Sequence, residues 1–161
     1  MTFSSAGIKA LLTCAVGLAL WTPMHGAQAG LGEHQGSIDI ERMRLHARKA
    51  VLNKVGYTVH ELHNQEGSRI KQFVTATGQV FAVTWVTQYK PDLSRLLGTR
   101  HAQYARAERE QSRHGGIQRH FKMDQQDVLV QSSAHLNVYS GFALLKPLAP
   151  AGFSLAQLVQ D

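Results

Sequence analysis

The segment TATGQVFAVTWVT, residues 75–87, constrains the fold more than any other part of this 161-residue chain. Its Thr77-Gly78 pair is typical of a tight hairpin turn, because glycine readily takes the positive φ that such turns need. Bulky side chains then alternate from residue 80 to residue 87, which predicts a strand with Phe81, Val83 and Trp85 on one face. Both faces of this strand are substantially apolar, so we expect it to lie buried inside a sheet, as scaffold.

The same patterns predict four more strands and one helix. Alternation and turn residues favour strands at 57–62, 69–75, 128–131 and 136–145, the last two forming a hairpin with a break near Ser132-Ser133-Ala134. After Pro91, leucines and a tyrosine recur at helical spacing, which predicts a helix near residues 92–108 that fades into a polar tract. The expected fold class is α+β, a single antiparallel β-sheet of about five strands with a helix packed on one face.

The first 29 residues have the three-part layout of a secretory signal peptide. Lys9 precedes an apolar run, residues 10–21, and the small residues Ala27 and Ala29 precede the expected cleavage site. The run is shorter than the ~20 residues that cross a bilayer as a helix, so no transmembrane anchor is expected. We therefore expect an exported protein, periplasmic or extracellular. Residues 30–55 are expected to form a flexible segment with a possible short helix from Ser37, and residues 56–161 a single α+β domain.

Cleavage after residue 29 would remove Cys14, the only cysteine, and would leave a chain without disulfides or thiolate metal sites. All but one of the 17 Lys and Arg, and all 11 Asp and Glu, follow residue 29, so the mature chain is basic. A basic surface favours acidic partners. The candidates are acidic envelope glycans, lipid headgroups or another envelope protein, whereas export argues against nucleic acid.

Two surfaces are candidates for binding. His135, Asn137 and Tyr139 would share one face of the predicted strand, where imidazole, amide and phenol could line a polar groove for sugar or peptide. The second surface is the basic tract from Arg95 to Lys122, which includes Arg106, Arg109 and Arg113. An ordinary solvent-facing row and a solvated helix face are the simpler interpretations of these two patterns.

No residue pattern assigns catalysis, a cofactor or a metal. His60 and His63 in the sequence HELH would point to opposite faces of a strand, so they could not hold one ion together without a bend. The chain has no G-x-S-x-G motif and no phosphate-binding glycine loop. The sequence around its acidic residues does not indicate a pair of carboxylates for glycoside hydrolysis. A small hydrolase of envelope polymers, with His135 as general base, and a metal chaperone remain alternatives to a binding protein.

Several motifs carry a resemblance to a known family. The stretches GYTVHEL (56–62), TATGQVFAVTW (75–85), PDLSRLLG (91–98), VLVQSSAHLNVYSGFALL (128–145) and LAPAGF (148–153) occur in this order. In these motifs the chain is similar to the bacterial exported family known as domain of unknown function 2844. The resemblance implies an exported location and a common scaffold, and it implies no catalytic residue. The function expected from residues and resemblance together is a non-enzymatic envelope binding or accessory module.

Overall fold

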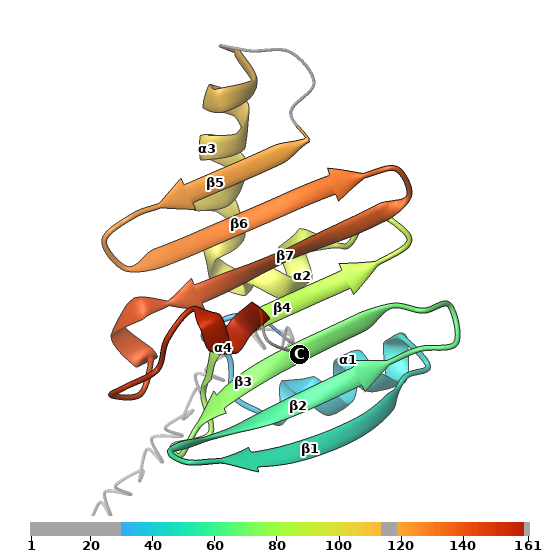
Figure 1. Cartoon of the computed structure of the whole chain (residues 1–161), viewed down its shortest axis with the longest axis vertical. Helices are drawn as coiled ribbons and strands as arrows, with labels where there is room; N and C mark the ends of the chain where they lie inside the picture. Colours follow the sequence, from blue (N-terminus) through green and yellow to red (C-terminus); the bar gives the residue numbers. More distant parts are fainter. Residues whose placement is uncertain (1–29, 114–118, 160–161) are drawn as a thin grey trace, which may run out of the picture.

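One seven-stranded antiparallel sheet, in the order β1-β2-β3-β4-β7-β6-β5, forms the centre of the protein (Figure 1). The structure, a computed structural model, describes residues 30–113 and 119–159. The strands are β1 (Arg48–Lys54), β2 (Tyr57–His63), β3 (Arg69–Thr75), β4 (Val80–Thr87), β5 (His120–Asp124), β6 (Val128–His135) and β7 (Val138–Leu145). The α+β class is confirmed, but the prediction of a five-stranded sheet is wrong.

The two strands missing from the prediction lie at the two edges of the sheet. Every residue of β1 is exposed, so this strand lacks the alternation of buried and exposed positions that reveals a strand. In β5, Phe121 and Met123 are buried between exposed neighbours, but the pattern is short and follows a polar tract. Charged residues such as Arg48 and Lys54 suit an edge, because they discourage pairing with another chain.

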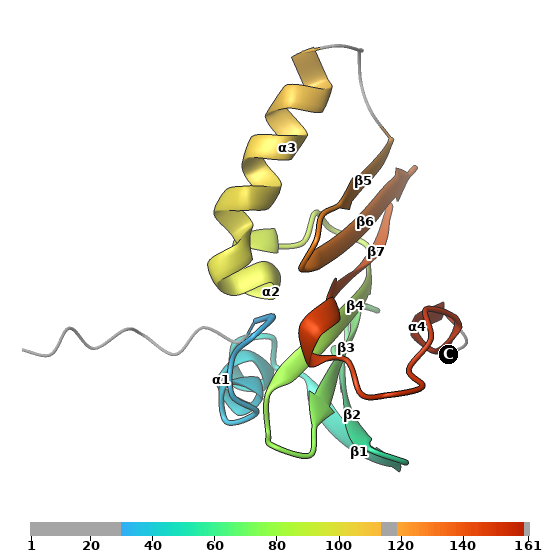
Figure 2. The same cartoon turned by 90° about the vertical axis from the view of Figure 1, so that its left-hand side faces the viewer.

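The helices lie unequally on the two faces of the sheet (Figure 2). On one face, the α3 face, are α1 (Ser37–Arg44), α2 (Leu93–Leu97) and α3 (His101–Arg113). The other face, the α4 face, carries α4 (Ala156–Val159), which follows the short 3-10 turn η2 (Lys146–Leu148). The helix expected near residues 92–108 is divided by the 3-10 turn η1 (Gly98–Arg100), and α3 continues to Arg113 where a polar tract was expected. The rest of that tract, residues 114–118, lies outside the described residues.

A β-bulge in β4 changes the predicted alternation of its side chains. The register with β3 shifts between Phe73 and Val74, which leaves Phe81 as an extra residue in β4. Phe81 therefore packs in the core on the α4 face, whereas Trp85 packs on the α3 face. The prediction that both are buried is confirmed, with 0% and 1% of each residue exposed, but the prediction that they share a face is wrong.

Each face of the sheet has its own apolar core. The core on the α3 face joins strand residues to the helices, and it includes Leu62, Trp85, Leu97, Tyr104 and Phe121. The core on the α4 face is aromatic and includes Phe73, Phe81 and Phe153. The rings of Phe81 and Phe153 meet edge to face with centroids 4.9 Å apart, an arrangement that aromatic pairs favour. The C-terminal segment thus covers part of the α4 face.

The β6–β7 hairpin turns later than predicted. Ser132, Ser133 and Ala134 remain in β6, and the turn lies at Leu136 and Asn137 between the paired residues 135 and 138. Leu136 has φ +53° and is 88% exposed. Positive φ at a β-turn usually selects glycine, asparagine or aspartate, so the leucine hides this turn from sequence reasoning.

Residues 30–47, at the start of the expected flexible segment, pack against the α3 face. Leu31 and Ile38 are fully buried in that core. The backbone N–H of Gly32 donates to the carbonyl of Val80 at 2.8 Å, next to the bulge. A Cβ on Gly30 would lie 2.3 Å from the carbonyl oxygen of Arg95, so this close approach of two backbones requires glycine.

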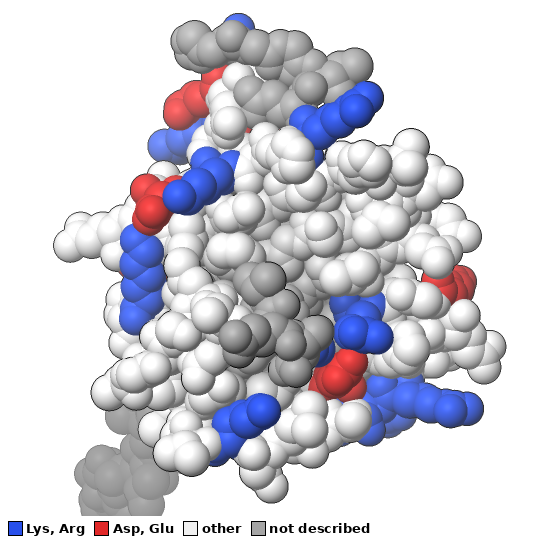
Figure 3. Space-filling model, viewed as in Figure 1, with Lys and Arg blue, Asp and Glu red and all other residues white. Residues whose placement is uncertain are grey.

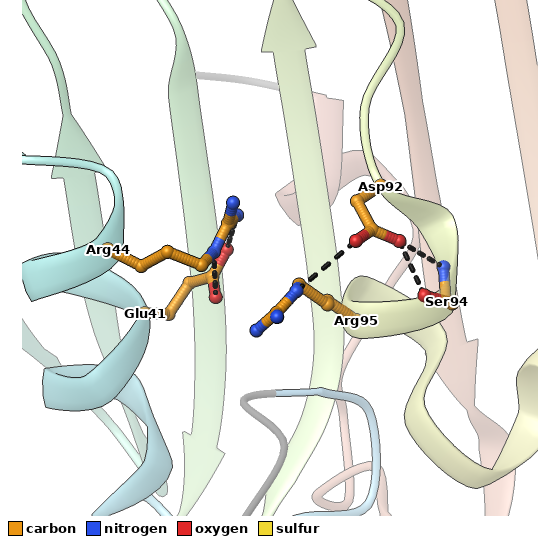
Figure 4. Close-up of polar contacts among 5 residues, drawn as sticks. All are labelled: Glu41, Arg44, Asp92, Ser94 and Arg95. Atoms are coloured by element: carbon orange, nitrogen blue, oxygen red, sulfur yellow. Dashed lines mark hydrogen bonds and ion pairs between the residues drawn. The ribbon is translucent and has the colours of Figure 1, made fainter.

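Two polar clusters lie within α1 and at the start of α2 (Figure 4). Glu41 is 1% exposed, and Arg44 donates to both of its carboxylate oxygens, from Nε to Oε2 at 3.0 Å and from Nη2 to Oε1. Asp92 caps α2, because its Oδ1 accepts from the backbone N–H of Ser94 at 3.1 Å. Hydrogen bonding from Ser94, followed by backbone donors and Arg95, lowers the pKa of Asp92.

Candidate functional site

The clearest candidate site is a hollow of about 310 Å³ between α3, the segment that joins β4 to α2, and the ends of β5, β6 and β7. We name it the α3 groove. Its lining includes Trp85, Tyr104, Glu108, Arg119, Ser132 and Tyr139. Its volume lies at the lower end of the range for small-molecule sites, which combine apolar walls with a few polar groups.

The groove forms where the cross-strand register brings residues of four strands to one end of the α3 face. Trp85 pairs with Gly141, which pairs with Ser132, which in turn pairs with Phe121. Gly141 has no side chain, so the indole of Trp85 can lie close to the backbone of the neighbouring strand. A Cβ on Gly141 would be only 2.5 Å from the Cζ2 atom of Trp85.

Tyr104 of α3 is the best-defined polar group of the groove. Its residue is 3% exposed, its ring meets that of Phe121 edge to face at 4.8 Å, and its hydroxyl donates to Oε1 of Glu108 at 3.1 Å. Burial, opposed by a hydrogen bond with Ser132 and assisted by the charge of Glu108, raises the pKa of Tyr104 to about 12. The phenol therefore stays protonated at neutral pH and acts as a hydrogen-bond donor rather than as a base.

Charged groups of both signs line the groove. Glu108 supplies a carboxylate, while Lys90 and Arg119 supply cations. A carboxylate accepts hydrogen bonds, and ammonium and guanidinium groups only donate them. The groove can therefore accept hydrogen bonds from hydroxyl groups on a ligand and donate to an acidic substituent on the same ligand.

The structure brings together parts of the two surfaces that the sequence treated as separate. Tyr139 and Arg119 line the same groove, although one comes from the predicted His135, Asn137 and Tyr139 row and the other from the basic tract. The row itself is divided by the hairpin turn. Tyr139 pairs with Ala134 on the α3 face, His135 ends β6, and Asn137 lies exposed in the turn.

The three arginines singled out in the basic tract lie outside the lining of the groove. Arg106, Arg109 and Arg113 lie on α3, and all three are exposed. They follow one another at spacings of three and four, which places them on one side of the helix. The structure thus supports a basic stripe on α3 beside the groove.

The histidines of HELH lie on opposite faces of β2, as predicted. His60 pairs with Gln72 and His63 pairs with Arg69, at positions of opposite parity along the strand. Burial, with a smaller contribution from the charge of Lys49, lowers the pKa of His60. Within the described residues, no group of three or more His, Cys, Asp or Glu residues could hold a metal ion.

His135 is the general base of the hydrolase alternative, and its exposure bears on that role. A general base is held within hydrogen-bond reach of the group that it deprotonates, usually in a concave pocket. His135 is exposed at the end of β6, and in the described part of the chain it makes no hydrogen bond or ion pair with a side chain.

Most of the groove could not be predicted from the sequence, because its residues match the pattern of a buried scaffold equally well. Tyr104 was placed correctly on the apolar stripe of a helix, and Trp85 was assigned to the scaffold; both are buried. The prediction lacked β5, the strand that brings Phe121 and Arg119 next to them. The alternation of Phe121 and Met123 is the sequence signal that could have revealed it.

In the described residues, none of the helices combines the length and the apolar content needed to cross a bilayer.

A comparison with family models matched residues 27–158 to the family described as "Protein of unknown function (DUF2844)". Further comparisons found no match among curated proteins and none among solved structures. Because the family model spans most of the chain and agrees with the motifs in residues 56–153, this protein belongs to the DUF2844 family.

Proposed function

We propose that this chain is an exported, non-enzymatic binding module of the bacterial envelope, and that it holds a sugar unit of an envelope polymer in the α3 groove. The observation that carries the proposal is the Tyr104–Glu108 pair. A buried phenol and a carboxylate, joined at 3.1 Å, line a hollow that also has aromatic walls. Tyr104 donates its hydroxyl hydrogen to Glu108, and its raised pKa keeps the phenol protonated, which suits recognition rather than proton transfer.

A sugar ring matches both kinds of lining. Its C–H faces can pack on the rings of Tyr139 and Phe121, which line the groove with Trp85. Its hydroxyl groups can donate to Glu108 and exchange hydrogen bonds with Ser132. Lys90 and Arg119 would add affinity for an acidic sugar, because hydrogen bonds between charged groups are stronger than neutral ones.

Export rests on the first 29 residues, which have the layout of a signal peptide. If the full-length chain is produced in a bacterial host, the protein in the exported fraction should begin at Gly30. Fractionation followed by N-terminal sequencing measures this. Full-length protein that stays in the cytoplasmic fraction would contradict export.

Binding can be tested on the exported protein by isothermal titration calorimetry. The ligands are short oligomers of N-acetylhexosamine, of hexuronic acid and of glucose. We expect saturable binding of at least one of the first two, and Tyr139→Ala should weaken it by roughly tenfold, the effect of about 1.4 kcal/mol of lost contacts.

The matched control is Tyr89→Ala, since Tyr89 is also a tyrosine, is 66% exposed and lies outside the groove lining. It should bind as the unmodified protein does. Equal weakening by both variants, or no binding of any of the three oligomers, would refute the groove as a sugar site. Glu108→Gln distinguishes the role of the carboxylate, because it keeps the shape of the side chain and removes its charge.

A further inference from the structure

The basic stripe on α3 consists of Arg106, Arg109 and Arg113, and it lies on the outward side of the helix. At about 100° per residue, these positions lie about 140–200° around the helix from Tyr104, the residue that α3 buries. Figure 2 shows that the side of α3 opposite to the sheet faces away from the rest of the protein. All three arginines are exposed there.

The guanidinium groups of the basic stripe have no acidic partner among the described residues. On the neighbouring turns, Arg95 pairs with Asp92 at 3.2 Å and Arg100 pairs with Asp127 at 2.6 Å. Within residues 30–113 and 119–159, the arginines of the stripe take part in no ion pair or side-chain hydrogen bond. Since a guanidinium offers five N–H donors, the stripe can meet anions without first breaking a contact in the protein.

The two glutamates of α3 lie on its flanks. Glu108 lines the α3 groove, and Glu110 lines a separate hollow beside β5 together with Lys122. Even with both glutamates counted and the histidine neutral, the three arginines leave α3 with one net positive charge. Residues 111–123 contain no Asp or Glu and add Arg119 and Lys122. The positive charge of the stripe is therefore not balanced by the sequence that follows it.

The shape of the basic stripe suits an extended anionic surface rather than a small ligand. Its arginines line neither the α3 groove nor the hollow beside β5. They project from the convex side of a helix and span roughly 10 Å along its axis, because seven residues separate the first from the last. A row of this kind cannot surround one anion, but it can meet several anions that lie in a plane.

The outward side of α3 offers little for burial in hydrocarbon. Next to the arginines, its apolar residues are Ala102 and Ala105, which have no large side chain. A helix that enters the acyl region of a bilayer needs a broad apolar face, so contact through this side would stay at the level of the headgroups. On the other side of the sheet, the surface over β6 and β7 is mostly uncharged and offers anions no comparable row (Figure 3).

We infer that the basic stripe docks the protein on an anionic lipid surface, with α3 lying along the headgroups. This surface is separate from the proposed sugar site, because none of its residues lines the α3 groove. Anionic headgroups are spread over a plane, so each guanidinium can meet one, whereas an acidic protein would have to match three positions. Each arginine near the leaflet strengthens binding by roughly fivefold, the equivalent of about 1 kcal/mol. Three such contacts make the docking weak and reversible.

The test is co-sedimentation of the exported protein with vesicles of phosphatidylglycerol and phosphatidylcholine, or of phosphatidylcholine alone. The protein should sediment only with the anionic vesicles. Salt at about 1 M should release it, because screening then limits charge interactions to about 3 Å. Arg106→Gln combined with Arg113→Gln should weaken partitioning by roughly 25-fold, fivefold for each arginine.

Glutamine is a good helix former, so α3 should form in this double variant, and circular dichroism checks that it does. Arg109→Gln alone serves as the second variant and should weaken partitioning by roughly fivefold.

The matched control is Arg48→Gln combined with Lys54→Gln. These exposed cations lie on β1, at the opposite edge of the sheet from β5, and their replacement changes the net charge equally. The control should retain vesicle binding within about twofold, because distant sites act independently. Tyr139→Ala should retain it too, which separates lipid docking from sugar binding.

Four results would overturn the inference. Equal losses in the two double variants would show attraction by overall charge alone. Equal sedimentation with neutral vesicles would show a contact that does not depend on charge. Retained binding after replacement of Arg106 and Arg113 would place the lipid contact elsewhere. Absence of sedimentation with anionic vesicles would exclude a lipid surface, and loss of hexuronic acid binding in the arginine variant would then assign the stripe to an acidic polymer.

Discussion

Gly141→Ala should destabilise the protein strongly, although it replaces glycine by a better strand former. The added Cβ would lie 2.3 Å from the carbonyl oxygen of Gln131 and 2.5 Å from Cζ2 of Trp85. Neither neighbour can easily move, because Gln131 belongs to the ladder between β6 and β7 and Trp85 is 1% exposed in the core.

The expected magnitude follows from these two contacts. Inserting a methyl group into a well-packed site usually costs about 1–3 kcal/mol. Since one of the contacts is with backbone, we expect a loss of about 3 kcal/mol in the free energy of unfolding, and a fall of about 10 °C in the midpoint of thermal unfolding. Strand propensity alone predicts the opposite sign, a gain of about 0.5–1 kcal/mol.

Urea unfolding followed by circular dichroism and by tryptophan fluorescence measures the change. Gly36→Ala is the matched control, because Gly36 has φ −59° and its added Cβ would come no closer than 3.7 Å to its nearest neighbour, Nδ1 of His34. The free energy of unfolding of Gly36→Ala should stay close to that of the unmodified protein. A Gly141→Ala protein as stable as the unmodified one, or more stable, would refute the reasoning about the Trp85 contact.

Three further changes test other parts of the structure. Arg44→Ala leaves the carboxylate of Glu41 buried without its partner and should cost about 3 kcal/mol in urea unfolding, whereas Arg44→Lys should cost less. Because the pKa of His60 is lowered on folding, the unfolded chain binds more protons, so stability should fall as the pH drops below about 6.5; a His60→Gln variant should lose that slope between about pH 7 and 5. Asp92→Ala removes the cap of α2 and should lower the free energy of unfolding by about 1 kcal/mol, while Asp92→Asn, which can still accept from Ser94, should lose little.

How far the fold could be predicted differs among the strands for identifiable reasons. The predicted bounds of β3 and β4 match the structure, since turn residues flank both strands and their side chains are largely buried. The face assignment within β4 failed at Phe81, because a bulge changes the alternation without a mark in the residue types. The turn at Leu136 was missed because a leucine occupies a position with φ +53°.

The candidate sites were less accessible from the sequence than the fold. Tyr139 was selected as a polar residue on a strand, and it does line the α3 groove. Its partners Tyr104 and Glu108 lie on a helix, and their proximity to Tyr139 depends on how α3 packs against β5. The hollow on the α4 face, lined by residues of β3, β4, β6 and β7, requires the register of four strands, which residue patterns cannot supply when a bulge and a hidden turn intervene.

The last strand along the chain, β7, lies at the centre of the sheet between β4 and β6. Its ladder with β4 joins residues far apart, such as Thr87 and Tyr139, which are 52 positions apart. Closing so long a loop costs conformational entropy before the β4–β7 contacts form. We therefore expect the two halves of the sheet to pair late in folding. A chain cut short before residue 138 would leave β4 and β6 as bare edges, and we expect such fragments to aggregate rather than to keep part of the fold.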